Sequence, residues 1–177
     1  MIITRRRVLG VGGGYFAALL LAPSPGLAAE PVDIVMRGTS DGSHVWFDPI
    51  GLHIQPGQVV RWTNRDPGNS HTVTAYHPTI FERARRIPEA ATAWDSDYLL
   101  PEQSFSFTFV EEGVYDYYCV PHEHAGMVGR IVVGNPPATE PNYTAEANLA
   151  PPPDVALANL PAVADILARG IVHPAGT

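Results

Sequence analysis

The chain has 177 residues, 45% of them hydrophobic, which is enough for one domain with appendages. Its basic residues are eleven arginines and no lysine against 18 acidic residues, so the formal net charge is −7. A surface of this sign repels nucleic acid and attracts cationic partners, and a function in nucleic-acid binding is therefore excluded.

The first 29 residues are typical of an export signal. Arg5, Arg6 and Arg7 precede an apolar run rich in glycine, alanine and leucine, and residues 26–29 supply the small side chains of a cleavage site. An arginine pair followed by apolar residues favours the twin-arginine export route. We therefore predict a signal peptide at residues 1–29 and a periplasmic location.

A retained membrane anchor is the alternative for this segment. Its apolar run of about 15 residues is shorter than the about 20 residues that a spanning helix needs. We therefore expect no stable membrane insertion after cleavage. The remaining chain would carry 8 basic and 18 acidic residues, a net charge of −10.

Short strand-like segments separated by turn residues follow the signal. They comprise residues 32–36, 45–54, 58–63, 71–76, 104–110, 114–119 and 128–133. Phe105, Phe107 and Phe109 alternate along one of them and share one of its faces. Short alternating strands with frequent turns predict an all-β domain, a β-sandwich or a barrel.

Residues 78–100 depart from the strand pattern. They contain Arg83, Arg85 and Arg86, followed by an alanine-rich piece. We expect a short helix and one irregular strand here, with the charges on a solvated face.

Residues 135–177 form a second exception, because their composition shifts to proline, alanine and asparagine. They predict a C-terminal extension with one short helix, which has Pro161 in its first turn and Gly170 at its end. Val163, Ile166 and Leu167 would form its apolar stripe and pack on the domain.

The residues that carry chemistry surround the single cysteine. Cys119 is followed by His122 and Met127 in a loop between two predicted strands, and His71 begins an earlier strand. A buried structural thiol and an intermolecular disulfide are the alternatives to a metal site. Two imidazoles and a thiolate with a weak axial thioether make a type 1, or blue, copper site that carries single electrons. We therefore predict one copper ion held by His71, Cys119, His122 and Met127.

Strand alternation supports this set of ligands. Tyr115, Tyr117 and Cys119 fall on one face of their strand, and the apolar tyrosines indicate that this face points inward. His71 likewise shares a face with apolar residues of its own strand. Tyr118 directly precedes the proposed ligand Cys119 and is expected to point outward.

Two segments resemble the cupredoxins of the plastocyanin and pseudoazurin type. Residues 113–129 contain Cys119-Val120-Pro121-His122 and Ala125-Gly126-Met127, and residues 54–64 lead into Ser70-His71-Thr72-Val73. The resemblance covers residues 32–134. It implies a Greek-key β-sandwich with copper at one end, and electron transfer between larger redox proteins. Thr72 stands where this family often has an asparagine that hydrogen-bonds near the cysteine.

The predicted organisation is a signal peptide at residues 1–29, a cupredoxin domain at 30–134 and an extension at 135–177. We expect a monomeric electron carrier without catalytic activity, whose transient partners are redox proteins, either a cytochrome or a copper enzyme. A subunit of a copper enzyme, such as a nitrite-reductase-like assembly, is one alternative and needs a second copper. A copper-binding or delivery module is the other.

The remaining histidines have no spacing that indicates further metal ligands. We expect His124 to be a solvent-facing loop residue. His77 lies at the far end of the strand that begins with His71. His44, His53 and His173 are expected to be structural or exposed.

Overall fold

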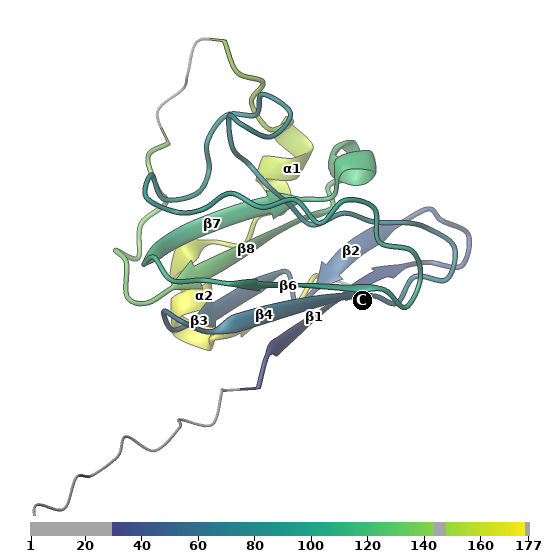
Figure 1. Cartoon of the computed structure of the whole chain (residues 1–177), viewed down its shortest axis with the longest axis horizontal. Helices are drawn as coiled ribbons and strands as arrows, with labels where there is room; N and C mark the ends of the chain where they lie inside the picture. The colour runs from purple at the N-terminus through teal and green to yellow at the C-terminus, as the bar shows by residue number, and fades with distance from the viewer. Residues whose placement is uncertain (1–29, 144–147, 176–177) are drawn as a thin grey trace, which may run out of the picture.

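A computed structural model describes residues 30–143 and 148–175 of the chain (Figure 1). The predicted signal peptide at residues 1–29 lies outside the described residues. No helix within the described ranges is long and apolar enough to span a membrane.

The described residues form two β-sheets that face each other (Figure 1). The first sheet has the order β2 (Val45–Asp48), β1 (Val32–Gly38), β4 (Val59–Asn64) and β6 (Ser104–Thr108). The second has the order β5 (Thr74–Ala75), β7 (Gly113–Tyr118), β8 (Val128–Val133), β3 (Gly51–Ile54) and β9 (Ile171–Val172).

The chain crosses repeatedly between the two sheets. Strand β1 pairs in parallel with β4, and β3 pairs in parallel with β8, whereas the other pairings are antiparallel. Parallel neighbours need a crossover, and here the crossover runs through the opposite sheet. The predicted all-β Greek-key sandwich is confirmed, and the predicted strand segments correspond to β1 through β8.

Aromatic residues fill the space between the sheets. Trp62 of β4 is fully buried, with its ring centroid 5.5 Å from that of Tyr117 and 6.2 Å from that of Phe109. Phe109 is fully buried, while Phe105 and Phe107 are half-buried against the same core. The predicted common face of the three phenylalanines is confirmed. Burial of such rings contributes much of the stability of a small domain.

The stretch 78–100 differs from its prediction. It contains no helix and instead follows the edge of the second sheet, where Leu99 bridges to His71 and Asp95 bridges to Thr74. Trp94 from this stretch enters the core and stacks on Phe107 at 4.7 Å. An irregular segment satisfies its main chain here by bonding to strands.

The arginines of this stretch do not lie on a solvated face. Arg86 pairs at 2.8 Å with the fully buried Asp116, and Arg83 pairs with the buried Glu123. The arginine side chains themselves are only 16% and 15% exposed. The prediction was wrong because both acidic partners lie far along the chain, where local composition gives no sign of them.

The part of the C-terminal extension that the structure describes contains two helices, α1 (Asp154–Asn159) and α2 (Val163–Arg169), where one was predicted. Helix α2 ends at Gly170 and buries Val163 and Ile166 against the second sheet, as predicted. The predicted place of Pro161 in its first turn was wrong, because the helix begins at Val163 with Ala162 as its N-cap residue and Pro161 precedes both. Helix α1 follows a proline-rich stretch that does not have a helical pattern.

Arg130 fastens the extension to the sandwich. Its guanidinium pairs with Asp116 at 2.6 Å and with Glu140 at 2.6 Å, and donates to the carbonyl of Pro161 at 2.9 Å. A buried guanidinium paired with two carboxylates holds its neighbours in one arrangement, because loss of a carboxylate would leave a buried charge without its partner. The extension is therefore part of the folded unit.

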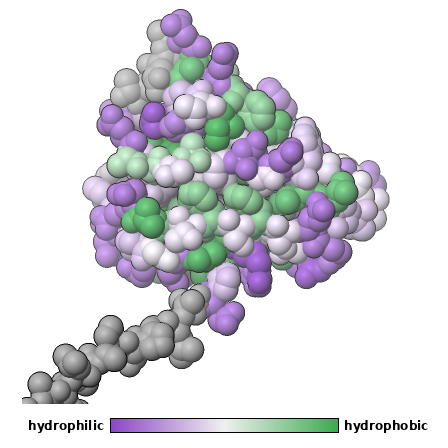
Figure 2. Space-filling model, viewed as in Figure 1, coloured by the Kyte–Doolittle hydropathy of each residue, from purple (hydrophilic) through white to green (hydrophobic). Residues whose placement is uncertain are grey.

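On the surface seen in Figure 2, apolar residues lie in small clusters between polar residues. This is expected where most large apolar side chains lie between the sheets. Among the residues that the structure describes, the large apolar side chains that remain exposed are Phe81, Tyr98, Leu100, Val110, Val155, Leu157 and Ile171.

Candidate metal centre

Two strands of the second sheet bring His71 and Cys119 together. Strand β5 pairs with the end of β7, so that Thr74 lies opposite Tyr118. Cys119 is the residue that follows β7, and His71 exchanges two main-chain hydrogen bonds with Leu99 at 3.1 and 2.8 Å. Both side chains are fully buried. Their positions are therefore set by regular main-chain bonding.

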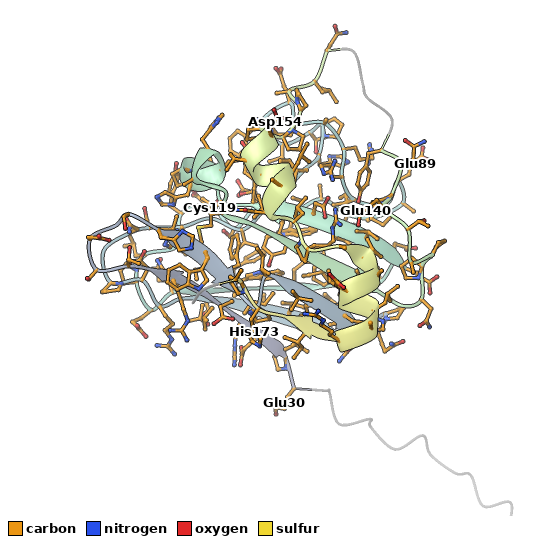
Figure 3. The ribbon with its side chains drawn as sticks, turned by 180° about the vertical axis from the view of Figure 1, so that it is seen from behind. Glu30, Glu89, Cys119, Glu140, Asp154 and His173 are labelled. Carbon is orange, nitrogen blue, oxygen red and sulfur yellow. The ribbon has the colours of Figure 1, made fainter. Side chains whose placement is uncertain are left out.

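The turn η1 (Val120–Ala125) adds His122 and Met127. The main chain forms a closed loop here, because Cys119 N–H donates to Met127 at 3.0 Å and Met127 N–H donates to His122 at 3.1 Å. Gly126 ends the turn with a φ of +81°, a conformation that glycine adopts without strain. Figure 3 labels Cys119 at this end of β7, near helix α1, which begins at Asp154.

Three potential ligand atoms converge at this point. His71 Nδ1 and His122 Nδ1 are 3.1 Å apart, and Cys119 Sγ lies 3.6 Å from the first and 3.4 Å from the second. A triangle with these sides has a centre about 2 Å from each corner, close to the about 2.0 to 2.3 Å at which imidazole and thiolate bind a metal such as zinc. The cluster can therefore hold one metal ion.

Met127 is fully buried beside this triangle and is bonded through its main chain to both Cys119 and His122. A thioether, a thiolate and two imidazoles form a soft donor set that suits copper in both of its common oxidation states. The donor chemistry therefore fits copper.

Burial governs the ionisation of the three groups. It lowers the pKa of His71 against the opposing effect of Asp66, and together with the neighbouring His71 it lowers the pKa of His122. Burial also raises the pKa of the Cys119 thiol to about 11. At neutral pH without a metal, both imidazoles are thus neutral and the thiol keeps its proton.

Thr72 supports the sulfur of Cys119 from the opposite strand. Its main-chain N–H donates to Cys119 Sγ at 3.3 Å, and its hydroxyl accepts a hydrogen bond of 2.8 Å from the Val120 N–H. The threonine therefore hydrogen-bonds next to the cysteine, as the resemblance implied for an asparagine.

Asp66 is a residue of this site that our sequence analysis missed. Its carboxylate accepts a hydrogen bond of 3.0 Å from His71 Nε2, on the side of the ring that faces away from Cys119. Burial alone would raise the pKa of Asp66, but hydrogen bonds from Asn69, Gly68 and His71 outweigh it and lower that pKa. The sequence Asp66-Pro67-Gly68-Asn69 indicates a turn, which by itself explains an aspartate at position 66, so no sequence pattern indicated its hydrogen bond with His71.

The position of Tyr118 differs from the prediction that its side chain points outward to solvent. It does lie on the opposite face of β7 from Cys119, but it is buried instead of exposed. Its ring stacks on Tyr76 at 4.3 Å and lies under the guanidinium of Arg83 at 5.4 Å. The stretch 78–100 and helix α1 cover this face.

The other histidines lie outside the cluster. His124 is exposed, as expected. His53 hydrogen-bonds to the carbonyl of Gly134, His44 stacks on Trp46, and His173 pairs with Asp48. His77 hydrogen-bonds to Thr79. These contacts agree with structural or surface roles.

A Greek-key sandwich with a His–Cys–His cluster at one end, two of its three residues fully buried, defines a cupredoxin. The family model of copper-binding proteins of the plastocyanin/azurin family matches residues 34–134. The chain belongs to this family, and the predicted plastocyanin and pseudoazurin type is confirmed.

Three relatives show the extent of this similarity. Plastocyanin of Synechococcus sp. (strain JA-2-3B'a(2-13)) is 35% identical over 128 residues, which are 70% of this chain and 85% of that protein. Pseudoazurin of Paracoccus pantotrophus is 31% identical over 121 residues, 68% and 74% of the two chains. Amicyanin of Paracoccus denitrificans is 33% identical over 118 residues, 66% and 78% of the two chains.

Proposed function

We propose that the protein carries single electrons on one type 1 copper ion, held by His71, Cys119, His122 and Met127. The observation that carries this proposal is the triangle of two Nδ1 atoms and one Sγ atom, with sides of 3.1, 3.4 and 3.6 Å. Membership of a copper-binding family supports the choice of metal.

Copper bound in such a site supplies a one-electron couple between Cu(I) and Cu(II). The part played by the protein is to keep the ligands in one geometry while the charge changes. His71, Cys119 and Met127 are fully buried. The main-chain bonds around η1 fix the spacing of Cys119 and Met127, and two main-chain bonds to Leu99 hold His71. Fixed ligands and exclusion of water keep the structural change on electron transfer small, and a small change permits fast transfer.

We also propose that residues 1–29 direct export to the periplasm by the twin-arginine route and are removed. Residues 30–134 then form the copper domain, and residues 135–177 form an extension that packs on it. The protein would act as a monomer and meet its redox partners, a cytochrome or a copper enzyme, only transiently. The support for export is the pattern of charge and apolar residues in the sequence.

A copper enzyme would need a second metal with an open coordination position. Within the described ranges, His71, Cys119 and His122 make up the one cluster of three histidine, cysteine or acidic side chains that could hold an ion. A delivery module would need ligands that release the metal readily, whereas three of the proposed four are fully buried. Both features favour a carrier.

The test is to measure copper content and visible absorption of the purified oxidised protein. We expect one copper per chain and an intense band from charge transfer between the Cys119 thiolate and Cu(II). Cys119→Ser should abolish the band while the circular dichroism of the fold persists, and His124→Ala, at an exposed histidine, should change neither. A wild-type protein that binds one copper without colour would contradict the proposal, and two coppers per chain would favour the enzyme.

A further inference from the structure

The two ring nitrogens of His71 have different surroundings. Nδ1 points to Cys119 Sγ and His122 Nδ1, at 3.6 and 3.1 Å. Nε2 points the other way and donates to Asp66 Oδ2 at 3.0 Å. A neutral imidazole carries one proton, and a carboxylate can only accept it. The proton is therefore held on Nε2, which leaves the lone pair of Nδ1 directed at the metal position.

Asp66 is itself held in place from several sides. Gly68 N–H donates to its carboxylate at 2.9 Å and the amide of Asn69 donates at 2.8 Å, so that with His71 three donors surround it. Its own N–H donates to Asn64 Oδ1 at 2.9 Å. On its open side lies Gly38, where a β-carbon would overlap the carboxylate. The side chain is thus confined to one orientation.

The charge of this carboxylate is not cancelled by a neighbouring cation. Asp66 is 2% exposed, and within the described ranges its one ion-pair contact is with His71, whose other ring nitrogen points to the metal position. By contrast, the buried Asp116 has two guanidinium partners, from Arg86 and Arg130. Asp66 therefore adds a negative charge behind the candidate metal centre, where low polarity strengthens electrostatic effects.

We propose that Asp66 is a positioning residue for the metal centre, which orients His71 and lowers the reduction potential. This inference rests on the proposed function, in which His71 binds copper. A carboxylate behind a ligating imidazole fixes its tautomer and raises its basicity, which favours the more highly charged metal ion. The negative charge acts in the same direction, because it attracts Cu(II) more strongly than Cu(I).

Asp66→Asn tests this with little change of shape, since the amide oxygen can still accept from His71 Nε2 while the charge is lost. Asp41→Asn is the matched control, because Asp41 lines the same surface groove but hydrogen-bonds to Thr39 and Ser43 instead of a proposed metal ligand.

We expect Asp66→Asn to retain the blue band and to bind Cu(II) about 10- to 100-fold more weakly. The ratio of Cu(II) to Cu(I) affinity should fall at least about tenfold, which is an upward shift of at least about 59 mV in a one-electron potential. Asp41→Asn should leave both quantities near the wild-type values.

Equal potentials and equal Cu(II) affinities in Asp66→Asn and the wild type would overturn the inference and leave the proposed function standing. A colourless wild-type copper complex would instead refute the proposed function. If Asp66→Asn does not fold, nitrogen-15 NMR of the metal-free wild-type protein decides, because no metal then dictates which ring nitrogen of His71 carries the proton. We expect the His71 Nε2 proton to exchange slowly with solvent, and a His71 that carries its proton on Nδ1 would overturn the inference.

Discussion

The side-chain amide of Asn159 donates a hydrogen bond of 3.0 Å to the main-chain carbonyl of Gly126. Helix α1 is thereby joined to the loop between His122 and Met127. The approach is close enough that a β-carbon on Gly126 would overlap the Asn159 side chain. The C-terminal extension thus supports the loop that provides two of the four proposed ligands.

Removal of this bond should loosen the loop. We predict that Asn159→Ala lowers the free energy of unfolding by about 0.5 to 1.5 kcal/mol, the usual net contribution of one hydrogen bond. The copper-loaded variant should also lose its metal to a chelator faster than the wild type. Urea unfolding and stopped-flow absorption measure the two effects.

Leu157→Ala is the control for Asn159→Ala, because Leu157 lies on the same short helix and its side chain is exposed. This variant should change the rate of copper loss little. Equal rates of copper loss in Asn159→Ala and the wild type would show that the loop does not depend on the extension.

Copper binding is predicted to release one proton per ion at neutral pH. Without metal the Cys119 thiol is protonated, because burial raises its pKa to about 11, and it binds copper as the thiolate. His71 and His122 have pKa values below the usual range and contribute no proton at neutral pH. The apparent affinity should therefore rise about tenfold for each pH unit from about 7 to about 10.

Calorimetry in buffers of different ionisation enthalpy counts these protons. Release of two or more protons at pH 7 would mean that an imidazole is charged in the metal-free protein. Release of none would mean that the thiolate exists before the metal arrives. Cys119→Ala provides the reference, since any residual binding by the two histidines should release no proton at pH 7.

The cluster of His71, Cys119 and His122 and most of the strands could be predicted from patterns within short stretches of the sequence. Alternation of apolar residues places Tyr115, Tyr117 and Cys119 on the inward face, and the structure buries all three. The donor types and spacing around Cys119 identify the metal chemistry. Neither argument needs contacts between distant parts of the chain.

The features that were missed depend on such distant contacts. The sequence around Arg83 predicts a surface charge, but the fold places Glu123 beside it. Strand alternation predicts an exposed Tyr118, but Tyr76 and α1 cover its side chain. Asp66 reads as a turn residue, because hydrogen-bonding to nearby main-chain N–H groups is a common use of aspartate. Its contact with His71 follows from the path of the loop after β4, which composition does not specify.

The charge distribution predicts salt-dependent association with a basic partner. In the described ranges Arg37, Arg61, Arg65, Arg83, Arg86 and Arg130 each pair with a carboxylate. The same ranges offer no cationic partner to the exposed Glu89 and Glu111. The uncompensated surface charge is thus acidic.

We expect the rate of electron transfer to a basic cytochrome to fall about tenfold or more as ionic strength rises from about 0.01 to about 0.1 M, because the screening length shortens from about 30 to about 10 Å. Stopped-flow kinetics measure this rate. Reduction by an uncharged small molecule should not depend on salt. A flat profile with the cytochrome would contradict electrostatic attraction.

The last prediction is that electrons pass through His122. His71 and Cys119 are fully buried, whereas His122 is half-buried and its neighbours Pro121 and Ala125 are exposed. The route through Tyr118 is covered by Tyr76 and Arg83. An imidazole edge among small apolar neighbours allows two molecules to approach closely and separate quickly, as a carrier requires.

Ala125→Glu should therefore slow electron self-exchange without disturbing the copper site. Two copies that meet through this face would bring two like charges together, and we expect the exchange rate to fall about tenfold or more. Copper content and the visible band should not change. NMR line broadening in mixtures of oxidised and reduced protein measures the rate.

Ala138→Glu is the control, since it places the same charge at an exposed position beyond the opposite end of β8 and should slow exchange much less. If both variants slow exchange equally, net charge and not the face around His122 controls the reaction. If Ala125→Glu exchanges at the wild-type rate, electrons leave by another route.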